Sequence, residues 1–84
     1  MVEAVVRSKN GLHARPAGMV VEQAVRHGGE VVLIKEGIRC NAKSILNIMG
    51  LGLAQGDRIA IAAEGEGGLR TENLLKSIIE GIEE

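Results

Sequence analysis

The chain has 84 residues, of which 45% are hydrophobic, and it contains no Phe, Tyr or Trp. This length fits a single domain over residues 1–84, with a modest core built from Val, Ile, Leu, Ala and Met. Ten basic and eleven acidic residues leave a net charge of −1. A chain with no basic excess and no aromatic side chains to stack on bases shows no sign of nucleic-acid binding.

The N-terminal residues and the cysteine content indicate a location. Residues 1–4 match neither a signal peptide nor a transit peptide, and no apolar run is long enough to span a membrane. The single cysteine, Cys40, excludes an internal disulfide and suits a reducing compartment. We expect Cys40 to be a small buried residue on a strand rather than a reactive thiol. The expected protein is cytoplasmic, without membrane insertion.

The first elements are predicted from apolar spacing. Alternating residues predict a strand over residues 2–7, and a short loop follows it. Apolar residues at i, i+3, i+4 and i+7 from Ala17 predict a helix that runs to about residue 26, where Gly28 and Gly29 stop it. His27 lies at the end of this helix, where we expect it to interact with the C-terminal carbonyl groups rather than to act in catalysis.

The remaining elements alternate between strands and helices. Ser44 is a good N-cap for the short helix, and Ile59 and Ile61 are expected to face inward from the last strand. The final helix is marked by apolar residues as far as Ile82. In chain order, these elements are a strand over 31–34, a turn at Glu36-Gly37, a strand over 38–42, a helix over 45–49, a strand over 58–63 and a helix from residue 69 or 71.

The element order is therefore β-α-β-β-α-β-α. A hairpin over residues 31–42 is consistent with an antiparallel sheet. One face of this sheet would be covered by helices and the other would be open to water, which is an α+β architecture.

The loop before the first helix carries the residues with chemical potential. Gly11 allows a sharp or left-handed turn, so the chain can enter the helix abruptly. His13 then lies at the helix N-terminus, with Arg15 two residues on and Pro16 in the first turn, where its missing N–H has no cost. Backbone N–H groups and a guanidinium beside an imidazole predict an anion site, and phosphate fits it best. The predicted phosphate-binding residues are Ala14, Arg15, Pro16 and Ala17.

The chemistry predicted for His13 is direct nucleophilic transfer. The helix dipole places partial positive charge beside the ring, which favours the neutral imidazole near pH 7. A neutral imidazole has an in-plane lone pair and needs no neighbouring base to attack phosphorus. Arg15 and the first-turn N–H groups would neutralise the transferred group, which carries about two negative charges.

Two motifs resemble those of the HPr family, the histidine-containing phosphocarriers of the bacterial phosphoenolpyruvate-dependent sugar phosphotransferase system. The first is Gly-Leu-His-Ala-Arg-Pro-Ala at residues 11–17, which is similar to the active-site signature of the family. The second is Lys-Ser-Ile-Leu-Asn-Ile-Met-Gly-Leu-Gly at residues 43–52, followed by Ala-Gln-Gly at residues 54–56. The resemblance covers essentially the whole chain and implies an open-faced β-sandwich, with a four-stranded antiparallel sheet in the order 1-4-2-3 and three helices on one face.

The resemblance also implies a function. His13 would accept a phosphoryl group from enzyme I on Nδ1 and pass it to a histidine on a sugar-specific enzyme II A domain, so the protein is a carrier rather than a turnover enzyme. Ile45, Leu46 and Met49 would form the docking patch, while Ile48 is expected in the core. In Gram-positive members the serine matching Ser44 is a regulatory phosphorylation site. A serine kinase/phosphorylase and a transcriptional regulator are therefore expected partners.

Two alternatives stay open at this point. One is a regulatory binding protein of carbon or nitrogen metabolism on the same fold, acting through Ser44 or phospho-His13. The other is a small hydrolase or transferase that uses His13 as a general base, although the sequence offers no nucleophile partner and little room for an enclosed pocket. Two histidines and one cysteine match no metal-ligand set, so neither a metal nor a cofactor is expected. The expected oligomeric state is a monomer.

Overall fold

The structure is a computed structural model that describes residues 1–81. Its element order confirms the predicted β-α-β-β-α-β-α pattern. Ile82, which we expected in the last helix, lies outside the described residues. The elements are β1 (Val2–Val5), α1 (Ala14–Ala24), β2 (Val31–Lys35), β3 (Ile38–Asn41), α2 (Ile45–Gly50), β4 (Arg58–Ala63) and α3 (Gly68–Gly81).

Element ends differ from the prediction by a few residues, with identifiable causes. β1 stops at Val5 because the next N–H, that of Val6, donates to the carbonyl of Asp57 in a loop (2.9 Å) and leaves the sheet ladder. α1 ends at Ala24, but the N–H groups of Arg26 and His27 still donate to carbonyl groups three residues earlier in the chain. A tighter turn therefore extends the helix.

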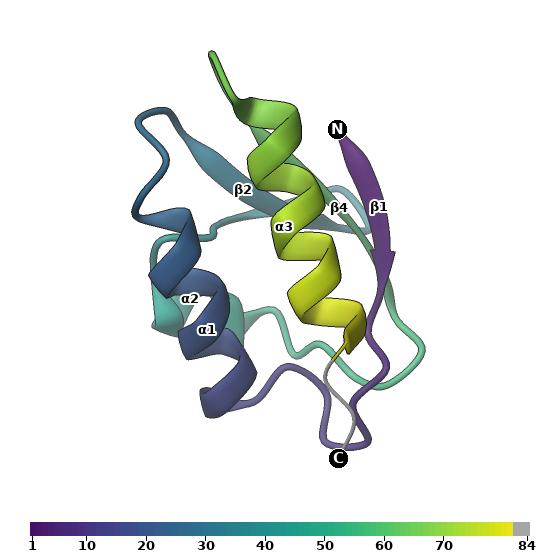
Figure 1. Ribbon diagram of the computed structural model, residues 1–84. Helices are drawn as coiled ribbons and strands as arrows, with labels where there is room; N and C mark the ends of the chain where they lie inside the picture. The colour runs from purple at the N-terminus through teal and green to yellow at the C-terminus, as the bar shows by residue number, and fades with distance from the viewer. Residues whose placement is uncertain (82–84) are drawn as a thin grey trace.

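The four strands form one antiparallel sheet in the order β1-β4-β2-β3, as predicted. Leu33 of β2 pairs with Ile61 of β4 on one side and with Cys40 of β3 on the other. Directly opposed residues point to the same face, so these three side chains share the inner face. α1 and α3 lie side by side across this face (Figure 1). The opposite face is open, and the fold is an open-faced β-sandwich.

The hairpin between β2 and β3 is closed by the two predicted turn residues. Glu36 and Gly37 both have positive φ, +49° and +80°. Two consecutive residues of this kind form a type I′ turn, whose twist matches that of the flanking strands.

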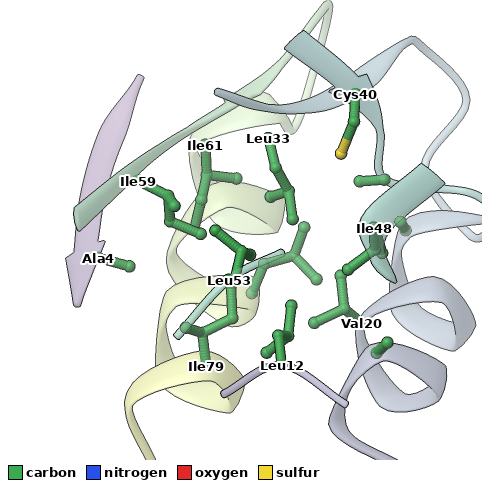
Figure 2. Packing of buried hydrophobic residues seen from close by; sticks show 14 of the residues in the cluster. Ala4, Leu12, Val20, Leu33, Cys40, Ile48, Leu53, Ile59, Ile61 and Ile79 are labelled. Carbon is green, nitrogen blue, oxygen red and sulfur yellow. The ribbon is translucent and has the colours of Figure 1, made fainter. Parts of the chain in front are cut away.

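The core is entirely aliphatic apart from one sulfur atom, and it lies between the inner sheet face and the helices (Figure 2). Ile59 and Ile61 are buried in it, as expected from the alternation of β4. Cys40 is also buried and points toward the cluster. Burial raises the pKa of its thiol, against a smaller opposing effect of the Leu33 backbone hydrogen bond. The prediction of a structural cysteine is confirmed.

The end of α3 is fastened to the edge strand by a carboxylate. Oε2 of Glu80 accepts the N–H of Val5 at 3.0 Å and lies 2.9 Å from Nζ of Lys76, which also donates to the carbonyl of Glu3 at 2.7 Å. The hydrogen bond from Lys76, followed by that from Val5, holds the pKa of Glu80 below its ordinary value. A lowered folded-state pKa contributes stability above the unfolded pKa of about 4.3, and this contribution disappears as the pH falls through the folded value.

We therefore expect Glu80→Gln to lower the melting temperature most at neutral pH. The difference from the unmodified protein should shrink below about pH 4.3, as the native carboxylate itself becomes protonated. Because the chain lacks aromatic residues, far-UV circular dichroism is the suitable probe. A difference that does not change between pH 7 and pH 3 would contradict the assigned role of the carboxylate.

The prediction for His27 is wrong in its hydrogen-bond partners. The ring is only 8% exposed, with Nε2 2.6 Å from the carbonyl oxygen of Glu64 and Nδ1 3.0 Å from the hydroxyl of Thr71. A carbonyl can only accept, so Nε2 donates to it, while Nδ1 lies within hydrogen-bond distance of the Thr71 hydroxyl. The ring reaches these partners because Gly29, which lacks a Cβ, lets the chain pass against the Glu64 carbonyl. The carbonyl groups after α1 are instead reached by Lys43, whose Nζ donates to the His27 carbonyl at 2.8 Å.

Candidate phosphoryl-transfer site

His13 is the N-cap residue of α1. Its backbone is extended (φ −79°, ψ −171°), and its carbonyl accepts the first helical hydrogen bond, from Ala17 N–H, at 2.9 Å. The residue is half-buried, whereas Arg15 in the first turn is exposed. The imidazole and the guanidinium therefore occupy the positive end of an 11-residue helix, as the sequence predicted.

The loop before His13 is built by a buried serine and a left-handed glycine. Ser8 is 1% exposed, and its carbonyl accepts the N–H of Gly11 at 3.0 Å while its hydroxyl accepts the N–H of Asn10 at 3.3 Å. Gly11 has φ +67°, which confirms the predicted left-handed turn. Leu12 then enters the core with 5% exposure. His13 thus follows directly after a residue that the core holds in place.

The four predicted phosphate-binding residues divide into two pairs. Ala14 and Arg15 are exposed, and they precede the first helical hydrogen bond. Pro16 and Ala17 are buried. Proline has no N–H, and the N–H of Ala17 is already bonded to His13. Pro16 and Ala17 therefore support the turn from the inside, and the exposed part of the predicted anion site consists of Ala14 and Arg15.

Ser44 caps the second helix, as predicted. Its hydroxyl oxygen accepts the backbone N–H of Asn47 at 3.3 Å and the side-chain amide of the same residue at 3.1 Å. The first of these bonds satisfies an N–H that has no partner within the helix, which is the role of a side-chain N-cap. The serine is half-buried, at the start of a six-residue helix.

The apolar residues of α2 lie on two sides of the helix. Ile48 is fully buried and belongs to the core, as expected. Ile45, Leu46 and Met49 are 38%, 80% and 44% exposed, so the three predicted docking side chains are accessible. Exposed apolar side chains beside a charged site are a common arrangement in protein interfaces.

Met19 is a docking candidate that the sequence pattern did not reveal. It is 46% exposed on α1 and follows Gly18, where an added Cβ would lie 3.7 Å from Cδ1 of Ile45. α1 and α2 therefore touch at this point. The available signal was the position of Met19 outside the i, i+3, i+4, i+7 stripe that predicted the core face of the helix. We define the docking surface as Met19, Ile45, Leu46 and Met49.

Neither a metal centre nor a membrane-spanning helix occurs within residues 1–81. No three His, Cys, Asp or Glu side chains in this range gather closely enough to hold a metal ion. None of the helices in the described part of the chain has the length and apolar character needed to cross a bilayer.

Comparison with known proteins gives one consistent result. Residues 2–82 match the family model PTS-HPr, described as the PTS HPr component phosphorylation site. The phosphocarrier protein HPr of Mycoplasma pneumoniae is 38% identical over 80 residues, which cover 94% of this chain and 91% of the relative.

Solved structures show the same fold. HPr-C-His from Thermoanaerobacter tengcongensis superposes with a TM-score of 0.88 at 36% identity, over 95% of this chain and 90% of that one. The Bacillus subtilis protein Crh gives a TM-score of 0.79 at 34% identity, over 96% and 93% of the two chains, and its crystal structure is a domain-swapped dimer. The monomeric state expected here therefore stays a prediction. The chain belongs to the HPr family of phosphocarriers, which interact with the enzymes of the phosphotransferase system.

Proposed function

We propose that this protein carries a phosphoryl group from phospho-enzyme I to sugar-specific enzyme II A domains, by way of His13. The observation that supports this proposal best is the half-buried position of His13 at the N-terminus of α1, two residues before an exposed arginine. Such a relay needs a shallow site, because two proteins in turn must bring a histidine in line with the same phosphorus atom. The working location is the cytoplasm, where both partners would act.

The transfer needs little beyond positioning and charge. The lone pair of His13 Nδ1 forms a bond to phosphorus as the bond between phosphorus and the enzyme I histidine breaks. The electron pair of the broken bond stays with enzyme I. The charge of the transferred group, about two negative units, is balanced by the guanidinium of Arg15 and by the positive end of α1. In the second transfer, a histidine of the enzyme II A domain forms a bond to phosphorus as the bond between phosphorus and His13 Nδ1 breaks, and the electron pair of the broken bond returns to His13.

The docking surface supplies the recognition. Met19, Ile45, Leu46 and Met49 are exposed on the two helices that touch beside the His13 loop. Burying these side chains against either partner removes apolar area from water, which is the general driving force for association. In this proposal enzyme I and the enzyme II A domains use the same surface in turn.

Ser44 gives this carrier a second input. A phosphate on its hydroxyl would lie at a helix N-terminus, so the modification need not unfold α2. It would add negative charge next to Ile45, at the edge of the docking surface. A serine kinase/phosphorylase would then control docking, and a transcriptional regulator presenting arginines could read the modified form. The similarity to Crh favours a regulatory protein of this kind as the second candidate function.

One mass-spectrometry experiment separates these functions. Incubation with enzyme I and phosphoenolpyruvate should add one phosphoryl group that is labile in acid, as a phosphohistidine is, and addition of an enzyme II A domain should remove it. Incubation with a serine kinase and ATP should add an acid-stable group at Ser44. An active enzyme I that leaves the chain unmodified would refute the carrier function, and the kinase reaction alone would support the regulatory one.

A further inference from the structure

The loop that carries His13 is bound along its length to a second segment, residues 52–57, which joins α2 to β4. The segment begins next to α2, which carries three residues of the docking surface, and its later residues bond the His13 loop. It therefore connects the two parts of the proposed site. Four hydrogen bonds link the loops: Val6 N–H to the Asp57 carbonyl (2.9 Å), Gly56 N–H to the Val6 carbonyl (2.7 Å), Gln55 Nε2 to the Arg7 carbonyl (3.2 Å) and Leu12 N–H to the Leu53 carbonyl (3.3 Å).

Segment 52–57 is in turn held by one lysine at the end of β2. Nζ of Lys35 lies 2.9 Å from Oδ2 of Asp57 and 3.5 Å from the carbonyl oxygen of Gly52, so it contacts both ends of the segment. The same Oδ2 accepts the N–H of Ala54 at 2.8 Å. The Ala54 N–H first, and then Lys35, hold the pKa of Asp57 below its usual range. The two side chains are only 21% and 28% exposed, unlike a typical surface pair.

Movement of this segment would reach His13 through a buried contact. Leu12 and Leu53 are 5% and 7% exposed, and both point into the core near Ile79 (Figure 2). The backbone of Leu53 also lies directly against Gly11, where an added Cβ would collide with its carbonyl oxygen. Because His13 is the next residue after Leu12, a displaced Leu53 would displace the N-cap of α1.

We propose that Lys35 is a positioning residue for His13, acting through its ion pair with Asp57 and the Leu53–Leu12 contact. The inference rests on the proposed carrier function of His13. In-line transfer depends on the placement of the reacting atoms, and a misplacement of about 1 Å can cost about 100-fold in rate. Because the four hydrogen bonds between the loops remain when the Lys35 contacts are removed, we expect a displacement smaller than about 1 Å and a smaller loss of rate. We expect this loss in kcat, because the displaced group is the nucleophile, whereas KM should stay nearly unchanged because the side chains of the docking surface are not replaced.

The test compares three variants in steady-state transfer from enzyme I. Lys35→Met and Asp57→Asn should each lower kcat about threefold to tenfold with KM nearly unchanged, because either change breaks the same pair. The amide oxygen that Asp57→Asn introduces can still accept the Ala54 N–H. Lys35→Arg keeps the charge and should restore the rate. Amide resonances of Gly11 and Leu12 should shift in the first two variants and return toward their original positions in the third.

Lys76→Met is the matched control. Lys76 also bonds one carboxylate at 2.9 Å and one carbonyl oxygen, but it lies on α3. This variant should keep the original kcat, and it measures what the loss of such a lysine does through stability alone. An unchanged kcat in Lys35→Met, an equal loss in Lys76→Met, or a change in KM alone would overturn the positioning role. If the protein without substitutions accepts no phosphoryl group, the proposed function itself is refuted.

Discussion

Replacement of His13 by alanine is expected to abolish acceptance of the phosphoryl group from enzyme I. The imidazole is the group that forms the bond to phosphorus in the proposed reaction, and neither Arg15 nor the helix N-terminus can replace it as a nucleophile. The fold should survive, because His13 is half-buried and its helical contribution, the carbonyl that accepts the Ala17 N–H, belongs to the backbone. The measurement is intact mass after incubation with phosphoenolpyruvate and enzyme I, with far-UV circular dichroism to verify folding.

The other histidine provides the control for this experiment. His27 is buried and bonded at both ring nitrogens, to Glu64 and Thr71. His27→Gln should therefore lower stability, since buried partners lose a hydrogen bond, but the folded fraction should still accept one phosphoryl group. Acid-labile labelling that persists in His13→Ala and disappears in His27→Gln would show that His27, and not His13, carries the group.

Among the possible Gly→Ala substitutions in this chain, Gly11→Ala is expected to give the largest loss of stability. A left-handed backbone such as φ +67° costs a residue other than glycine about 1–2 kcal/mol. The added Cβ would also collide with the Leu53 carbonyl oxygen and lie 3.2 Å from Cα of Ala54, and relieving such overpacking costs about 1–3 kcal/mol more. The sum is a substantial part of the stability of a domain this small, which is on the order of 4–13 kcal/mol.

Gly37 isolates the two contributions. Its φ is +80°, and an added Cβ there would meet no heavy atom within 4 Å. Gly37→Ala therefore loses stability only through the backbone conformation, by about 1–2 kcal/mol. Urea unfolding followed by far-UV circular dichroism gives both values. Equal losses in the two alanine variants would show that the loop adapts to the extra atom and that its contact with Leu53 is not tight.

Local patterns were enough to predict most of the fold. Alternation placed Ile59 and Ile61 inward on β4, and the combination of glycine, histidine and proline placed His13 at a helix start. These features depend on neighbours within a few residues, which a sequence displays directly. The strand order came from the family resemblance, since periodicity alone does not say which strands pair.

The missed features depend on residues far apart in the chain. His27 bonds Glu64 and Thr71, which are 37 and 44 residues away, and no local rule indicates either partner. The ion pair proposed to support the His13 loop likewise joins distant residues: Lys35 at the end of β2 and Asp57 in the segment before β4. Within the site itself, the phosphate contacts at Pro16 and Ala17 stay a prediction. The apolar stripe that begins at Ala17 already indicated that this residue faces inward, and the structure adds that Pro16 is buried as well.

The single buried residue of α2 has a consequence for how the carrier meets different partners. Ile48 is the one side chain by which this six-residue helix enters the core. Gly18 of α1 also lies against Ile45 of this helix, and segments with few buried side chains open at lower free energy than the whole domain. We therefore expect α2 to adjust its position more readily than the strands of the sheet, so that each enzyme can select its own orientation of Ile45, Leu46 and Met49.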